Sequence, residues 1–182
     1  MAKAASKYIS FDTAGNFVSE LADGPAAPEA TEDGSLKSAV SYALDAIVEA
    51  VAKAFAAQAS ALAEMAVQET GFGNAEDKTA KNLFASQRVA EAVRDMRTVG
   101  VLREVPEKKL WEIGVPVGVI AAIIPSTNPT STVCYKALIA IKAGCAIVFS
   151  PHPKAAKCTR AAAELLHWLA LSAQRLATWL VR

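Results

Sequence analysis

The hydrophobic pattern of this chain changes from helical to extended near Gly100. Across residues 36–69, apolar side chains recur every three or four positions with charged side chains between them, which predicts a long helix broken near Ser60. Gly71 suits the left-handed conformation that ends many helices. A second helical pattern covers residues 77–97.

Short apolar segments with extended character follow Gly100. Residues 101–105 and 110–113 flank a polar turn, which predicts a β-hairpin. Two further apolar runs, residues 117–124 and 145–149, enclose a helical pattern. This order predicts a βαβ unit and therefore an α/β fold with a parallel sheet.

The helix inside the βαβ unit has recognisable boundary residues. Asn128 is a typical N-cap residue, Pro129 suits the first helical position, and Gly144 suits the position just past the end. A last helical pattern runs from Lys154 toward the C-terminus, so the unit continues as βαβα.

The chain divides into three parts by composition. Residues 1–34 combine weak apolar patterning with a stretch rich in Pro, Gly and acidic residues, so we expect a flexible N-terminal extension and linker. Residues 35–99 are expected to form a helical segment, and residues 100–182 are expected to hold the hairpin and the βαβα unit.

The bulk composition argues against several classes of function. The chain has 182 residues, 53% of them hydrophobic, and a formal net charge of +1, which gives no electrostatic case for nucleic-acid binding. No apolar run approaches the roughly 20 residues needed to span a bilayer. The first residues lack the apolar region of a secretion signal, and the three cysteines lack metal-type spacing. We therefore expect a cytoplasmic protein with no metal site and no membrane or nucleic-acid partner.

Polar residues follow both strands of the βαβ unit, where ligands bind in open α/β sheets. The amide of Asn128 could donate hydrogen bonds to a developing oxyanion, or it could simply cap the helix, and spacing alone favours the cap. Ser126 and Thr127 allow the same two interpretations. The first strand is not followed by G-x-G-x-x-G, so the usual dinucleotide fingerprint is missing.

The three cysteines are weak candidates for a nucleophile. Cys134 and Cys145 fall in apolar patterns, where cysteine behaves as a small apolar residue. Cys158 falls near the start of the last helix, but no histidine is spaced to activate it. His152, between two prolines, has no evident partner ligands for a metal, and we interpret it as a loop residue or a neighbour of a cofactor.

Three segments carry a resemblance to a known family: MAVQETGFGNAEDKTAKNLFASQ, then RTVGVLRE, then PVGVIAAIIPSTNPTSTVCYKALIAIKAGCAIVFSPHPKAAKCT. From about Met65 to Thr159 the chain resembles the N-terminal portion of the CoA-acylating aldehyde dehydrogenases, of the acetaldehyde and sulfoacetaldehyde dehydrogenase type. The combination of IIPSTNPTST with FSPHP is typical of this branch. The resemblance implies N-terminal helices followed by part of the Rossmann-like parallel sheet of the aldehyde dehydrogenase fold.

The resemblance also implies an activity. The family oxidises an aldehyde with NAD(P)⁺ and transfers the acyl group from a cysteine thioester to CoA, so NAD or NADP and CoA are the expected cofactor and co-substrate. By position, Asn128 would be the oxyanion donor. The implied cofactor-binding residues are Ile124, Pro125, Ser126 and Thr127 on the nicotinamide side, and Ser150, Pro151 and His152 along the adenosine ribose. Pro153 stands where hydrolytic relatives place an acidic residue, so the preference between NAD and NADP stays open.

The nucleophilic cysteine of the family lies in a later catalytic domain, and none of the three cysteines here matches it. The resemblance also fades after His167. We therefore expect a truncated or frameshifted chain, with only part of an NAD(P)-binding unit, that is inactive alone. The alternatives are a non-catalytic interaction or assembly protein and a stand-alone nucleotide-binding module. We also expect a homo-oligomer, and a bacterial microcompartment is an alternative location.

Overall fold

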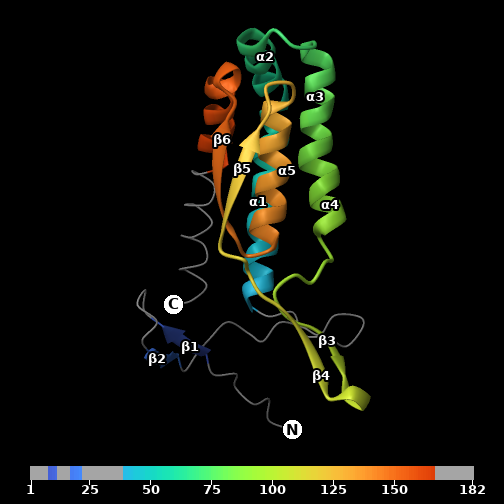
Figure 1. The fold of residues 1–182 in the computed structure, drawn as a ribbon, viewed down its shortest axis with the longest axis vertical. Helices are drawn as coiled ribbons and strands as arrows, with labels where there is room; N and C mark the ends of the chain where they lie inside the picture. Colours follow the sequence, from blue (N-terminus) through green and yellow to red (C-terminus); the bar gives the residue numbers. More distant parts are fainter. Residues whose placement is uncertain (1–7, 12–16, 22–38, 167–182) are drawn as a thin grey trace.

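In the computed structural model, the residues described are 8–11, 17–21 and 39–166, and they form helices and three two-stranded sheets (Figure 1). Strands β1 (Tyr8–Phe11) and β2 (Phe17–Leu21) pair antiparallel within the segment expected to be an extension. The linker expected after them lies outside the described residues.

The long helix predicted across residues 36–69 is two helices, α1 (Ala39–Ala57) and α2 (Ala59–Thr70). The break falls at Gln58, two residues before the predicted position, and the two helices are bent by 63°. Among the described residues, no single helix is long and apolar enough to cross a membrane. The bent pair reaches that length and hydropathy only when both helices are counted together. Helix α2 ends at Thr70, and the φ of 70° at the next residue, Gly71, confirms the predicted left-handed stop.

The second predicted helix begins earlier and ends earlier than its pattern indicated. Helix α3 (Ala75–Leu83) starts at Ala75 because the Asn74 side chain accepts a hydrogen bond from the main-chain N–H of Asp77 at 2.8 Å. A π-helical segment, η1 (Phe84–Arg88), follows, and α4 (Val89–Val93) ends the run. The predicted end at residue 97 is therefore wrong, and a π-helical segment is not visible in a pattern of apolar spacing.

The predicted hairpin is confirmed. Strands β3 (Gly100–Val105) and β4 (Leu110–Gly114) pair antiparallel around the short 3₁₀ segment η2 (Pro106–Lys108). The turn closes with Lys109 at a φ of 48°. In Figure 1 the hairpin extends away from the helices, and most of its side chains are exposed.

The predicted βαβ unit is also confirmed. Strands β5 (Val119–Ile124) and β6 (Ala146–Pro151) are parallel, and α5 (Pro129–Lys142) connects them. Gly144, just past the end of α5, has a φ of 69°. The 3₁₀ segment η3 (Pro153–Ala155) follows β6, and residues 156–166 are helical.

Helix α5 lies at the centre of the core, between the β5–β6 sheet and α1 (Figure 1). Its Val133 and Leu138 are fully buried, as is Phe55 of α1. Side chains alternate across β5, so that Ile124 is buried toward α5 while Ile123 is 75% exposed on the other face. The sheet is therefore covered on one face by the described residues, and its carboxyl edge is open.

Candidate functional site

The two polar turns of the βαβ unit lie side by side at the carboxyl edge of the sheet. Ile123 pairs with Ser150 and Ile124 with Pro151 in the parallel register. Just beyond, the main-chain N–H of His152 donates to the main-chain oxygen of Ile124 at 2.9 Å. Ligands bind at this edge in open α/β sheets, so the juxtaposition supports the predicted site, which stays a prediction.

Asn128 occupies the N-cap position of α5, but its side chain makes no capping hydrogen bond. The amide oxygen Oδ1 instead accepts a hydrogen bond from Lys81 Nζ at 3.2 Å. The amide nitrogen Nδ2 makes one long contact, 3.5 Å to Thr127 Oγ1. The capping alternative therefore does not describe this side chain, and its N–H groups are available to a ligand.

Helix α3 holds the turn before Asn128 through a buried lysine. Lys78 is 5% exposed, and its Nζ donates to the main-chain oxygen of Thr127 at 2.5 Å. Burial, and then the neighbouring Lys81 ammonium, lowers the pKa of Lys78 from its ordinary value. Two ammonium groups, one helical turn apart, thus face the turn that carries Asn128.

A buried hydrogen-bond network joins the same helix to α5. The amide of Asn82, 1% exposed, donates from Nδ2 to the main-chain oxygen of Ala59 at 2.9 Å. Its Oδ1 accepts from Thr130 Oγ1, in the first turn of α5, also at 2.9 Å. Because buried polar groups are costly to leave unpaired, this network resists relative movement of α2, α3 and α5.

The predicted cofactor-binding residues differ in exposure. Ile124 is a core residue with 0% of its surface exposed. Ser126 is half-buried. The exposed members of the set are Pro125, Thr127, Ser150, Pro151 and His152. Their roles toward a nucleotide stay predictions.

His152 has a local structural role. Its ring nitrogen Nδ1 accepts a hydrogen bond from the main-chain N–H of Lys154 at 3.1 Å, which caps the 3₁₀ segment η3. Among the described residues, no group of three His, Cys, Asp or Glu side chains could hold a metal ion.

All three cysteines are free and buried. Burial raises the pKa of the Cys134 thiol and of the Cys158 thiol to about 12. A carboxylate, Glu69, contributes to the shift at Cys158. These thiols are protonated near neutral pH, which agrees with the interpretation of these cysteines as small apolar residues.

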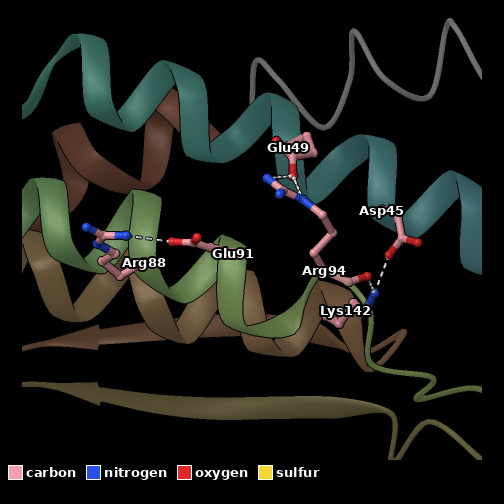
Figure 2. Close-up of polar contacts among 6 residues, drawn as sticks. All are labelled: Asp45, Glu49, Arg88, Glu91, Arg94 and Lys142. Atoms are coloured by element: carbon pink, nitrogen blue, oxygen red, sulfur yellow. Dashed lines mark hydrogen bonds and ion pairs between the residues drawn. The ribbon is translucent and has the colours of Figure 1, made fainter.

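An open hollow of about 430 Å³ lies elsewhere, between α1 and the η1–α4 segment. Four of its charged side chains form two ion pairs (Figure 2): Arg88 contacts Glu91 at 2.8 Å, and Arg94 contacts Glu49 at 2.9 Å. None of its lining residues comes from the two turns. We therefore place the candidate site at the turns, which lie at the carboxyl edge of the parallel sheet.

The sequence profile of the aldehyde dehydrogenase family matches residues 25–174, and the chain belongs to that family. Aldehyde-alcohol dehydrogenase 2 of Entamoeba histolytica is 45% identical over 130 residues, which are 71% of this chain and 15% of that protein. Succinate-semialdehyde dehydrogenase (acetylating) of Clostridium kluyveri is 39% identical over 124 residues, which are 68% of this chain and 27% of that protein.

Solved structures show the same relationship. The crystal structure of an acetylating aldehyde dehydrogenase from Geobacillus thermoglucosidasius is 57% identical, with a TM-score of 0.72 over 73% of this chain and 29% of that chain. The chain therefore spans less than a third of the length of each of these relatives. The expected resemblance to acylating aldehyde dehydrogenases and the expected α/β fold are confirmed.

The sequence reasoning missed the residues of α3 that contact the site. Lys78, Lys81 and Asn82 lie at positions i, i+3 and i+4 of one helix, so they share one face. That face is polar although it packs against the rest of the molecule. The available signal for this polar face was the pattern K-x-x-K-N within one predicted helix.

Proposed function

We propose that this chain is the N-terminal part of an acylating aldehyde dehydrogenase that oxidises a small aldehyde to an acyl-CoA. The observation that carries the proposal is the amide of Asn128. It lies at the carboxyl edge of a parallel sheet, contacts Lys81, and is not used to cap α5. A donor at this place would stabilise the negative charge that develops on the carbonyl oxygen when a thiolate adds to the aldehyde.

The proposed cofactor is NAD or NADP, which supplies the acceptor for the hydride, and the proposed acyl acceptor is CoA. Two relatives support this assignment. An engineered glycolyl-CoA reductase with bound NADP⁺ is 26% identical, and the propionaldehyde dehydrogenase of Rhodopseudomonas palustris with bound propionyl-CoA is 27% identical, each with a TM-score of 0.59. In this chain, exposed hydroxyl and imidazole groups of Thr127, Ser150 and His152 at the edge of the sheet suit the polar parts of a nucleotide.

The nucleophilic thiolate is proposed to come from a residue other than Cys134, Cys145 and Cys158. Burial of these side chains, and the high pKa of Cys134 and Cys158, support this assignment. We therefore expect the chain by itself to form no NADH from an aldehyde and CoA.

A hybrid enzyme tests the role of Asn128. In the Geobacillus acetylating aldehyde dehydrogenase, the matching segment is replaced by this chain, and NADH formation from acetaldehyde and CoA is followed. Asn128→Ala is expected to lower kcat roughly 100- to 1000-fold, the cost of losing an oxyanion donor. The matched control is Asn74→Ala, because Asn74 is an exposed asparagine whose side-chain hydrogen bonds, to the main chain and side chain of Asp77, stay within the first turn of α3. An Asn128→Ala hybrid with kcat close to that of its parent would refute the proposal, as would NADH formation by the chain alone.

The β3–β4 hairpin supports a proposal about assembly. Trp111 is 63% exposed and Ile113 is 56% exposed, on a sheet whose edges pair with no further strand among the described residues. Open edges with apolar side chains invite pairing with another chain, and we propose a second copy of this chain as the partner. Ile113→Lys is expected to lower the mass measured by light scattering. Lys53→Glu, a control on α1, is expected to leave that mass unchanged. A monomeric parent chain would contradict the proposal.

We propose a cytoplasmic location for the protein, with a bacterial microcompartment as the alternative. A propionaldehyde dehydrogenase from the Clostridium phytofermentans fucose utilisation bacterial microcompartment is 30% identical, with a TM-score of 0.58. It supports a microcompartment as the alternative to the cytoplasm. Fluorescence microscopy of the tagged chain in its own cells distinguishes a diffuse signal from discrete foci.

A further inference from the structure

We propose that Lys81 is a positioning residue for Asn128, which orients the amide so that its nitrogen, and not its oxygen, faces the reacting carbonyl. The inference rests on the proposed function, since it takes Asn128 as the oxyanion donor. Nothing in the pattern of the turn itself sets this orientation; it comes from a contact across 47 positions of the chain, from α3 to the start of α5.

The chemistry of the contact allows one orientation of the amide. A primary amide has an accepting end, Oδ1, and a donating end, Nδ2, of nearly the same shape. An ammonium group only donates, so Lys81 Nζ at 3.2 Å requires Oδ1 on its side. The donating end must then point away from Lys81. That donating end makes a long contact to Thr127 Oγ1, at 3.5 Å.

The support behind Lys81 is rigid. One turn earlier on α3, the buried ammonium of Lys78 donates to the main-chain oxygen of Thr127 at 2.5 Å. One position later, the buried amide of Asn82 binds Thr130 at 2.9 Å. Residues before and after Asn128 are thus held by the same face of α3. Lys81 itself is exposed, so its removal changes the contact to Asn128 without opening the core.

The charge of Lys81 adds to its orienting effect. A positive group that donates to the oxygen of an amide polarises it and makes its N–H groups more positive. Those N–H groups would then bind an oxyanion more strongly than a neutral amide in the same place. The loss of Lys81 should therefore weaken the proposed donor, and not remove it.

Two measurements test the inference. In the hybrid enzyme, Lys81→Met is expected to lower kcat about tenfold and to leave the KM values unchanged. This loss is smaller than the roughly 100- to 1000-fold loss expected when the donor itself is removed. Lys81→Arg, which keeps a donor, is expected to restore most of the rate. In the Asn128→Ala background, Lys81→Met should have no further effect, because Lys81 acts through that amide. An equal further loss in that background, or no loss in the parent background, would overturn the inference.

The second measurement does not depend on catalysis. In the full chain, the side-chain amide of Asn128 is followed by ¹H–¹⁵N spectra. Lys81→Met is expected to shift both of its N–H resonances, whereas Lys53→Met, which removes an exposed lysine of α1, leaves them in place. Unchanged resonances in Lys81→Met would overturn the positioning role. If the resonances shift but Asn128→Ala leaves kcat intact in the hybrid, the proposed function fails while the contact stands.

Discussion

The buried ion pair between Lys142 and Asp45 leads to a specific prediction about stability. The side chain of Lys142, at the end of α5, is 4% exposed and donates to Asp45 Oδ1 of α1 (Figure 2). It also donates to the main-chain oxygen of Arg94, just past α4, at 2.9 Å. One side chain thus ties three segments together. We expect Lys142→Met to destabilise the chain, because methionine keeps the apolar stem but supplies neither hydrogen bond.

The magnitude follows from burial. Removing one partner of a buried ion pair costs about 3–5 kcal/mol. Since the side chain of Asp45 is 20% exposed, water recovers part of its solvation, and we expect a loss of about 3 kcal/mol. The matched control is Arg88→Met, which breaks a pair with Glu91 whose side chains are 68% and 58% exposed. Such a surface pair contributes about 0–1 kcal/mol.

Urea unfolding followed by circular dichroism gives the free energy of unfolding of each variant. A loss below about 1 kcal/mol for Lys142→Met at an unchanged m-value would refute the reasoning. So would equal losses for Lys142→Met and Arg88→Met. In a double-mutant cycle, Asp45→Asn should lose less stability in the Lys142→Met background than alone, because the two groups act as a pair. Strictly additive losses would contradict this account.

Three further predictions concern other parts of the molecule. Partial burial raises the pKa of Glu69. Its carboxylate, however, accepts hydrogen bonds from the main-chain N–H groups of Cys158 and Lys157, at 2.7 and 2.8 Å. These hydrogen bonds outweigh burial and hold the pKa below its ordinary value of 4.5. A pKa lowered by folding adds stability above pH 4.5, and this stability is lost as the pH falls through the folded pKa. Glu69→Gln should therefore lower the free energy of unfolding by about 1 kcal/mol at pH 7 and by less near pH 3, measured by urea unfolding at both pH values. Phe55→Ala should cost about 3–5 kcal/mol in thermal unfolding, because Phe55 is fully buried, and a loss below about 1 kcal/mol would contradict its place in the core. Alkylation of Cys134 and Cys158 by iodoacetamide, followed by mass spectrometry, should be slow in the native chain and fast in urea; fast native labelling would contradict the raised pKa of both thiols.

Local sequence signals predicted most of the secondary structure. The β5–α5–β6 unit follows from two apolar runs and from Pro129 and Gly144 at the ends of the helix, and the hairpin follows from two short runs around a polar turn. Such signals depend on neighbours a few positions apart, so they can be evaluated without knowledge of the fold. The exact break at Gln58 and the π-helical segment could not be predicted this way, because packing against other helices decides both.

The place of the candidate site could also be predicted from the sequence, but its arrangement could not. Apolar strands that end in polar turns identify the carboxyl edge of a sheet. The lysines of α3 lie about 50 positions before the turn, and no periodicity relates the two segments. Their approach depends on the bend between α1 and α2 and on the buried contact of Asn82 with Ala59.

For Asn128, the sequence alone determined that a polar side chain begins a helix after a parallel strand. It left two roles open, a helix cap and a hydrogen-bond donor to a ligand, and spacing alone favoured the cap. The tertiary structure decided against the cap, because the ammonium of Lys81 binds the amide oxygen that capping would use. The physical reason is the orientation of the side chain: in the conformation that brings Oδ1 to Lys81 Nζ, Oδ1 makes no hydrogen bond to the first turn of its own helix, and that contact depends on packing across 47 positions of the chain.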